Sequence, residues 1–243
     1  IYSIYLKNPG KYIDIFNFVW APLHDNLNGN NIFSTLTSPN KLKKYLISDN
    51  HSNFINNYKK PIIGVLIGGT SKHFNFGKKE VNKLCISLKK IKEKYSASLI
   101  ITCSRRTDNK TKNFIANYFN GEDNWVWNGQ NDNPYEDILN NSNFFIVTSD
   151  SVNMISEASS TGKPIYVYKL PKKNIRIKSI PKKLVIFFKE LENKNIIRWF
   201  DGNLEEWEYK AINPTQEIAN KIIVSYNNHI KKLKESVNNY EKI

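Results

Sequence analysis

The chain has 243 residues, and its 36 Lys and Arg residues against 22 Asp and Glu residues give it a formal net charge of +14. This length can bury one large core or two modest ones, and 40% hydrophobic residues in periodic segments exclude a disordered chain. No apolar run approaches the roughly 20 residues that a transmembrane helix requires, so we do not expect the chain to span a membrane.

The predicted elements begin with two short runs that are rich in β-branched and aromatic residues, Ile1–Leu6 and Ile13–Trp20. Turn-forming residues bound both runs, and this pattern predicts two strands of a parallel sheet. The polar stretch Ser34–Asn57 follows, with Ser38 before Pro39 as the start signal of a helix. We interpret this stretch as a connector that carries one helix.

Strands and helices alternate from residue 62 onward. Strands are predicted at Ile62–Ile67, Ser98–Cys103, Trp125–Trp127, Phe144–Val147 and Ile165–Tyr168. Helices are predicted at Phe76–Tyr95, Thr111–Phe119, Asn133–Leu139, Val152–Thr161 and Leu184–Leu191, and a long amphipathic helix at Pro214–Tyr240. The alternation predicts a Rossmann-like α/β unit with a parallel sheet.

Three counts qualify this prediction. The two cysteines, Cys85 and Cys103, form neither a disulfide framework nor a metal-binding pattern, which is typical of a protein of the reducing cytoplasm. Lysine makes up 32 of the 36 basic residues; we favour a codon bias as the reason over contact with nucleic acid or anionic lipid, so the four arginines are the more informative cations. The chain begins at Ile1 and its single methionine is Met154, so we interpret it as lacking its N-terminal part.

Ligands of an open parallel sheet bind outside the carboxyl ends of the strands, and this rule selects four loops. The first, Gly68-Gly69-Thr70-Ser71, leads into a helix. Glycine permits close approach of a ligand to the backbone, and amides near the start of a helix attract phosphate. An ordinary turn between a strand and a helix is the alternative interpretation, and the sequence leaves both open.

The second loop, Ser104-Arg105-Arg106-Thr107, places two of the scarce arginines at the end of another strand. The planar fork of arginine suits phosphate oxygens. A solvated surface pair is the alternative, but in a chain that uses so much lysine we favour a phosphate-binding role.

The third loop, Thr148–Glu157, reads TSDSVNMISE and runs from the end of a strand into a helix. Ser151 or Asn153 lies near the predicted start of the helix, and Glu157 lies about one turn inside it. A carboxylate at that place can accept two hydrogen bonds from the hydroxyls of a ribose. The alternative is capping of the helix by Ser or Asp, with Glu157 as a capping-box partner.

The fourth loop, Pro22-Leu23-His24-Asp25, follows the strand predicted at Ile13–Trp20. The side chain of His24 titrates near neutral pH and could act as a general base with Asp25 nearby. A purely structural His-Asp dipeptide is the alternative, and it stays open.

Several blocks of the sequence together resemble the mitochondrial fission Elm-type family. They are APLHD at 21–25, LIGGTSK at 66–72, TCSRRT at 102–107, NPY at 133–135, VTSDSVNMISEA at 147–158, TGKP at 161–164, RWFDG at 198–202 and WEY at 207–209. The resemblance implies a GT-B-like α/β architecture: the end of an N-terminal Rossmann-like domain at 1–38, a connector at 39–60, a complete C-terminal Rossmann-like nucleotide-binding domain at 61–212, and a C-terminal helix at 213–243 that packs back toward the N-terminal domain.

The chain is similar, more distantly, to the peptidoglycan N-acetylglucosaminyltransferase, in which a Ser/Gly-rich loop and a helix glutamate hold a nucleotide-sugar. On that pattern Glu157 matches the carboxylate that binds ribose, and Gly68-Gly69 matches the diphosphate loop. We therefore expect a cytoplasmic protein that binds a nucleotide-sugar and acts as a glycosyltransferase at the inner membrane surface.

The expected site follows from these comparisons and from the four loops. His24 and Asp25 are the expected catalytic residues. The expected nucleotide and phosphate ligands are Gly68, Gly69, Thr70, Ser71, Ser104, Arg105, Arg106, Asn133, Tyr135, Ser149, Asp150, Ser151, Asn153, Met154 and Glu157. We expect no cofactor and no metal, since fixed positive charge can stabilise a departing phosphate.

The expected partners are a nucleotide-sugar donor, a lipid-linked or glycan acceptor, and an anionic membrane surface that would meet the basic stretch Pro171–Lys189. A non-catalytic adaptor on the same scaffold is the competing function. A nucleic-acid binder is a third, and it is disfavoured because the aromatic residues fall inside predicted strands instead of alternating with basic residues.

Overall fold

The computed structural model describes residues 1–41, 55, 57–121, 123–127, 129, 133–173 and 181–240. The chain forms two compact units, and the C-terminal segment belongs with the N-terminal one. Unit 1 comprises Ile1–Lys41 and Asn213–Ile243, and unit 2 comprises Leu42–Ile212. The helix expected in the connector at 39–60 falls mostly outside the described residues.

Unit 2 contains a six-stranded, fully parallel sheet. Its strands are β4 (Ile62–Ile67), β5 (Ser98–Cys103), β6 (Asn124–Val126), β7 (Phe144–Thr148), β8 (Ile165–Tyr168) and β9 (Ile197–Trp199). They lie in the order β6-β5-β4-β7-β8-β9. β5 and β6 are therefore added on one side of β4, and β7, β8 and β9 are then added on its other side. This is the strand order of a Rossmann fold, and it confirms the predicted fold class.

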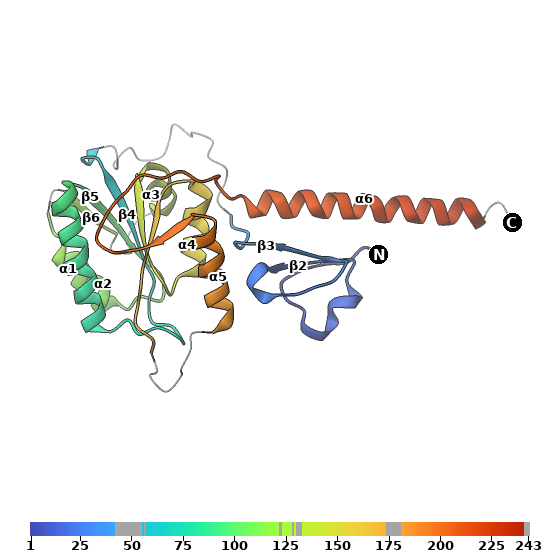
Figure 1. Ribbon diagram of the computed structural model, residues 1–243, viewed down its shortest axis with the longest axis horizontal. Helices are drawn as coiled ribbons and strands as arrows, with labels where there is room; N and C mark the ends of the chain where they lie inside the picture. The colour runs from blue at the N-terminus through green and yellow to red at the C-terminus, as the bar shows by residue number, and fades with distance from the viewer. Residues whose placement is uncertain are drawn as a thin grey trace. The chain divides into compact units, whose positions relative to one another are not determined.

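Helices cover both faces of this sheet. They are α1 (Lys78–Tyr95), α2 (Asn109–Tyr118), α3 (Tyr135–Asn141), α4 (Val152–Ala158) and α5 (Lys182–Asn193). Figure 1 shows α1 and α2 on one face and α4 and α5 on the other. α1 buries Val81, Leu84, Leu88 and Ile91, which recur at helical spacing, against the β-branched side chains of the sheet.

The pairing of β4 positions the loops that matter for function. β4 pairs in parallel with both β5 and β7, with Leu66 opposite Thr102 on one side and opposite Val147 on the other. The carboxyl ends of these three strands therefore lie together, and so do the loops that follow them. This is the point at which the strand order reverses, where ligands of such sheets bind.

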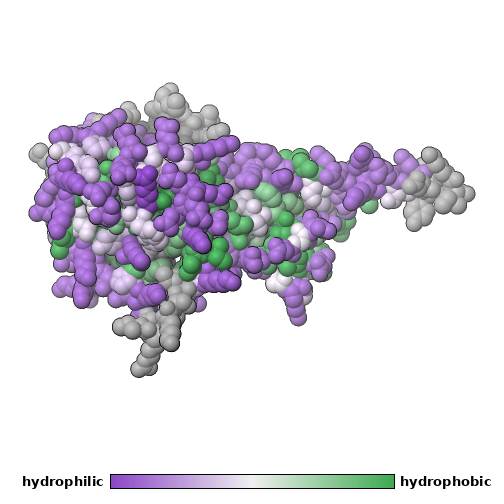
Figure 2. Space-filling view, viewed as in Figure 1, coloured by the Kyte–Doolittle hydropathy of each residue, from purple (hydrophilic) through white to green (hydrophobic). Residues whose placement is uncertain are grey.

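Unit 1 is smaller and has a parallel sheet in the order β1-β2-β3. Its elements are β1 (Ile4–Leu6), β2 (Phe18–Pro22), β3 (Ile32–Thr35) and the 27-residue helix α6 (Pro214–Tyr240). Ile218 of α6 is buried with Phe18 and Trp20, and the Trp20 indole donates a hydrogen bond to Thr35 Oγ1 at 2.9 Å. Large apolar side chains stay on the surface of this unit (Figure 2), among them Ile4, Leu6, Ile15, Ile223, Val224, Leu233 and Val237.

Several predicted boundaries are wrong. The strand expected at Ile13–Trp20 begins only at Phe18, because Gly10–Ile15 forms a 3-10 helix whose apolar residues are not buried. β3 and β9 were not predicted, since three or four residues show no clear alternation. The helix expected at Val152–Thr161 is α4 followed by a 3-10 turn at Ser159–Thr161, and Gly162 ends it at a φ of 75°. No helix within the described residues has an apolar stretch long enough to cross a bilayer.

Candidate functional site

A cavity of about 670 Å³ opens in unit 2 at the carboxyl ends of β5, β6 and β7. It is lined by Thr102, Cys103, Ser104, Arg105, Arg106, Trp127, Asn133, Tyr135, Asp150, Ser151, Val152, Asn153, Met154 and Glu157. Ten of these fourteen residues are among the expected ligands, so the loops after β5 and β7 and the start of α3 meet around one space. Its volume is in the range of small-molecule sites, about 300–1,000 Å³.

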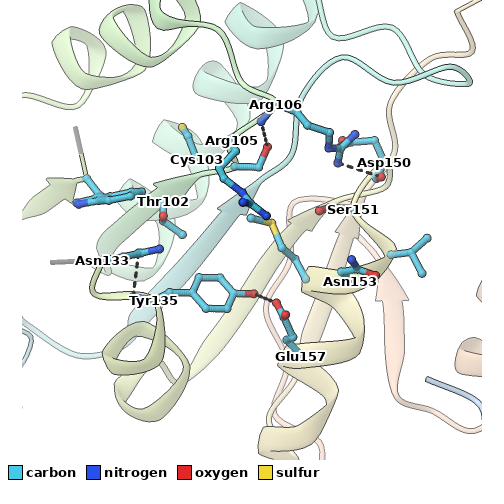
Figure 3. Close-up of a pocket in the computed structure, with 14 residues that line it drawn as sticks. Thr102, Cys103, Arg105, Arg106, Asn133, Tyr135, Asp150, Ser151, Asn153 and Glu157 are labelled. Atoms are coloured by element: carbon cyan, nitrogen blue, oxygen red, sulfur yellow. Dashed lines mark hydrogen bonds and ion pairs between the residues drawn. The ribbon is translucent and has the colours of Figure 1, made fainter. Parts of the chain in front are cut away.

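A phenol and a carboxylate form one wall of this cavity. The Tyr135 hydroxyl donates a hydrogen bond of 2.5 Å to Glu157 Oε2, which joins α3 to α4 (Figure 3). Asn133 orients the start of α3, because its side-chain oxygen accepts a hydrogen bond of 3.2 Å from the Tyr135 amide. Burial raises the pKa of Glu157, and the hydrogen bond from Tyr135 opposes that shift. No other described residue bonds to the Glu157 side chain, so Oε1 is available to accept a hydrogen bond from a ligand.

The two arginines after β5 lie in different environments. Arg106 Nη2 lies 2.9 Å from Asp150 Oδ2, and it donates a longer hydrogen bond of 3.4 Å to the Asp150 carbonyl. The Asp150 side chain is fully buried, whereas that of Arg106 is 43% exposed. Arg105 makes no hydrogen bond or ion pair with any residue that the structure describes. Figure 3 shows its side chain reaching over the cavity, between the Arg106–Asp150 pair and the Tyr135–Glu157 pair.

Two backbone amides of the glycine loop form hydrogen bonds within the protein. The Gly68 amide donates to Thr148 Oγ1 and the Gly69 amide to Asp150 Oδ2, each at 2.8 Å. A Cβ atom at Gly68 would lie 2.1–2.5 Å from the Asp150 carboxylate, and one at Gly69 would lie 2.5 Å from the Arg106 backbone. These glycines therefore permit the close approach of three loops. Neither lines the cavity, and their phosphate-binding role stays a prediction.

The other expected ligands of this edge mostly brace the loops. Ser71 Oγ accepts hydrogen bonds from the backbone amides of His73 and Phe74. Ser149 is buried, and its hydroxyl accepts a hydrogen bond of 3.0 Å from the Leu170 amide. Ser104 Oγ accepts a hydrogen bond from the Arg106 amide at 3.2 Å. Of these serines only Ser104 lines the cavity.

The capping interpretation of the third loop does not hold. Ser151 precedes α4, but its side chain makes no capping hydrogen bond. Glu157 lies in the sixth position of α4, too far from the start for a capping box, which requires the third position. Asn153 is exposed at the mouth of the cavity and Met154 is half-buried in its wall.

His24 and Asp25 lie in unit 1, on the short 3-10 turn Leu23–Asp25 that follows β2. His24 Nε2 is 3.9 Å from Asp25 Oδ1, and their side chains are 16% and 9% exposed. Neither residue lines the cavity of unit 2. Across the described part of the chain, no three His, Cys, Asp or Glu side chains gather closely enough to hold a metal ion.

Four residues of the cavity were not among the expected ligands: Thr102, Cys103, Trp127 and Val152. Three of them end or directly follow β5 and β6, so the strand-end rule could have found them if it had been extended to the last strand residues. Burial raises the pKa of the Cys103 thiol to about 12, which disfavours the thiolate form that reacts.

The basic stretch Pro171–Lys189 is only partly described, since residues 174–180 lie outside the described ranges. Lys172, Lys173, Lys182 and Lys183 are exposed. Its apolar cluster does not form a membrane-facing surface as a whole: Phe187 and Phe188 are buried in the core, and Val185 is the clearly exposed member. The aromatic residues there stabilise α5 against the sheet.

Comparison with known proteins places the chain in a recognised group. The model of the family described as "Mitochondrial fission ELM1" matches residues 1–226. An uncharacterized protein of Rickettsia prowazekii is 34% identical over 167 residues, which are 66% of this chain and 45% of that protein. The mitochondrial fission protein ELM1 of Arabidopsis thaliana is also 34% identical over 167 residues, 67% of this chain and 37% of that protein. The matched region thus spans less than half of each relative.

Among solved structures, a Listeria monocytogenes protein assigned as a UDP-N-acetylglucosamine 2-epimerase is similar with a TM-score of 0.51 and 15% identity. The similarity covers 90% of this chain and 61% of that one. At this identity the likeness shows the fold alone. The fold is GT-B-like, in agreement with the Rossmann strand order of unit 2.

Proposed function

The chain belongs to the mitochondrial fission ELM1 family, and we propose that its unit 2 binds a nucleotide-sugar in the cavity between the loops after β5 and β7. One observation carries this proposal. An open guanidinium, Arg105, lies in the same cavity as a half-buried carboxylate, Glu157, one oxygen of which has no partner among the described residues. Phosphate and ribose are the two groups of a nucleotide that such side chains recognise.

Each part of a nucleotide-sugar has a matching group. Arg105 provides a guanidinium for the diphosphate, and Arg106, held by Asp150, provides a second at a fixed place. Glu157 Oε1 accepts hydrogen bonds from ribose hydroxyls, while Tyr135 fixes the other oxygen. The ring of Trp127 lines the cavity and offers an apolar face to the base.

We further propose that the family member acts as a glycosyltransferase. The arginines would stabilise the negative charge that develops on the departing diphosphate. This stabilisation is largest when the hydrogen-bond donors are already in place before the reaction. His24, with Asp25 beside it, is the proposed base that removes the proton of an acceptor hydroxyl. A cytoplasmic location, a lipid-linked or glycan acceptor and docking to an anionic membrane through Lys172, Lys173 and their neighbours are parts of the same proposal.

Isothermal titration calorimetry of the chain with UDP-N-acetylglucosamine, GDP-mannose, CMP-sialic acid and ADP-glucose tests the binding step. We expect one of the four to bind with a stoichiometry of one and Arg105→Gln to weaken it. A matched control is Arg198→Gln, which also removes an arginine of unit 2 but lies outside the cavity lining. Absence of binding by all four, or equal binding by both variants, would contradict the proposal.

The second candidate is a non-catalytic recruitment protein on the same scaffold. It is favoured by the apolar side chains exposed on unit 1 and by the name of the Arabidopsis relative, which is a mitochondrial fission protein. The two candidates differ at His24. If the protein is an enzyme, His24→Ala abolishes transfer and leaves nucleotide affinity unchanged; if it is a recruitment protein, no sugar is transferred or hydrolysed by the unsubstituted protein.

A further inference from the structure

A second cavity, of about 480 Å³, lies in unit 2 beside the first turns of α1 and α2. It is lined by Thr70, Phe76, Gly77, Lys78, Val81, Asp108, Lys110, Thr111 and Phe114. None of these residues lines the first cavity. The loop after β5 separates the two spaces, because its start (104–106) lines the first cavity and Asp108 lines the second. The site proposed for the nucleotide-sugar therefore does not account for this cavity.

The apolar side of the cavity is mainly aromatic. Phe76 and Val81 are almost fully buried, at 4% and 2% exposure, and they belong to the core of unit 2. Phe114 is half-buried and packs against the same core. Two of the three apolar side chains are thus phenyl rings held in place by the core, and rings prefer the edge-to-face or offset packing of another aromatic group.

The polar side of the cavity carries two lysines and one carboxylate, and so a net positive charge. Lys78 and Lys110 are exposed, and neither forms an ion pair with any residue in the described ranges. The one carboxylate of the lining, Asp108, is already engaged: it caps α2 by accepting hydrogen bonds of 2.9 Å from the amide and from the hydroxyl of Thr111. These hydrogen bonds lower the pKa of Asp108 and turn its charge toward the helix.

We propose that this second cavity binds a small aromatic anion, separate from the nucleotide-sugar of the first. The ring of the ligand packs against Phe76 and Phe114, and its anionic group pairs with Lys78 and Lys110. The hydroxyls of Thr70 and Thr111 are further hydrogen-bond partners. A space of about 480 Å³ is large enough for a fused two-ring body with one phosphate or carboxylate, within the usual size of small-molecule sites.

The test uses 1-naphthyl phosphate as the probe, with inorganic phosphate and 1-naphthol as its two halves, in calorimetric titrations of the full chain. We expect 1-naphthyl phosphate to bind at least about tenfold more tightly than either half, because its ring and its phosphate each contact the cavity. Lys78→Gln/Lys110→Gln should weaken its binding at least about tenfold, since two charge-assisted contacts are lost. The matched control, Lys83→Gln/Lys90→Gln, removes two exposed lysines of α1 outside the cavity and should change affinity less than about twofold.

A further variant separates the two cavities. Arg105→Gln, in the first cavity, should leave the affinity for 1-naphthyl phosphate unchanged. Weaker binding in Arg105→Gln with no change in Lys78→Gln/Lys110→Gln would place the probe in the first cavity and overturn the proposal. Three other results would overturn it as well. The two lysine double variants could lose the same affinity for the probe, inorganic phosphate could bind as tightly as the probe, or the probe could fail to bind at millimolar concentration. None of these outcomes depends on whether the first cavity binds a nucleotide-sugar.

Discussion

Two loops follow neighbouring strands at the same edge of the sheet: the glycine loop after β4 (Gly68–Ser71) and the arginine loop after β5 (Ser104–Thr107). Their polar groups make different contacts. In the glycine loop two amides are bonded within the protein, to Thr148 and Asp150. In the arginine loop one guanidinium is bonded to Asp150, and the other, on Arg105, reaches over the cavity. Composition suggests phosphate binding for both loops; the geometry engages the Gly68 and Gly69 amides within the protein and leaves the Arg105 guanidinium without a described partner.

Crowding at the strand ends explains the difference. Asp150 is inserted between the two loops with a fully buried side chain, and its Oδ1 has no hydrogen-bond partner among the described residues. The carboxylate fits only because Gly68 has no side chain. The glycine loop is therefore part of the support for the arginine loop. Substitutions in the first should affect folding, and substitutions around the cavity should affect binding.

The largest expected effect is on stability, from Gly68→Ala. The new methyl group would lie 2.1–2.5 Å from the Asp150 carboxylate, which is fully buried and bonded to the Gly69 amide and to Arg106, so we expect the free energy of unfolding to fall by about 2–4 kcal/mol. Urea denaturation followed by circular dichroism measures it. The control is Gly121→Ala, whose methyl group would meet no described atom beyond its chain neighbours closer than 3.8 Å and should change stability by less than about 0.5 kcal/mol. Equal effects of the two substitutions would break the comparison.

The next effect is on binding, from Glu157→Gln. If this carboxylate accepts hydrogen bonds from ribose, the amide should weaken nucleotide binding by about 1–3 kcal/mol, the value of a hydrogen bond to a charged group. The fold should be retained, because the one described partner of the side chain is Tyr135. Calorimetry with the best-binding nucleotide-sugar measures the loss. An unchanged affinity in a folded variant would assign Glu157 a structural role.

Much of this architecture could be predicted from local patterns. The strands from Ile62 to Tyr168 are short apolar runs that end in polar or glycine residues, and helical spacing in Val81, Leu84, Leu88 and Ile91 marks the buried side of α1. The strand-end rule identifies eight of the expected residues that line the cavity, and the family resemblance adds Asn133 and Tyr135. Local sequence carries this information because a strand buried on both faces is a short continuous apolar run, whereas a helix face repeats its apolar residues every three or four positions.

Other features could not be predicted, because they depend on contacts between distant residues. The ion pair of the partly exposed Arg106 with the buried Asp150 spans 44 positions, and nothing near either residue indicates it. The amides of Gly68 and Gly69 donate to Thr148 and Asp150, which lie about 80 positions away in the sequence. Ile13–Ile15 are predicted as the start of a strand but belong to the 3-10 helix Gly10–Ile15, because composition favours a strand there and only the packing shows that these residues are not buried.

The third prediction separates the two arginines. Arg106→Gln leaves the buried Asp150 carboxylate without its cation, and we expect a loss of about 1–2 kcal/mol in the free energy of unfolding, less than for a fully buried pair because Arg106 is partly exposed. Arg105→Gln, which breaks no described contact, should change stability by less than about 0.5 kcal/mol. Urea denaturation of the two variants side by side decides it. Equal stability of both would show that the ion pair does not hold the arginine loop.

The smallest expected effect is a pH dependence at Glu157. Burial raises its pKa, so between the ordinary value of 4.5 and the folded-state value the folded protein binds more protons than the unfolded chain. Stability must then fall as pH rises through this interval, and Glu157→Gln, which cannot ionise, should lack this component. Unfolding free energies of both proteins from pH 4 to pH 8 measure the difference. Tyr135→Phe sharpens the test: it removes the hydrogen bond that opposes the shift, so the fall should extend to higher pH. A stability of the unsubstituted protein that rises with pH relative to Glu157→Gln would mean that the folded protein favours the ionised carboxylate, and the burial argument would be wrong.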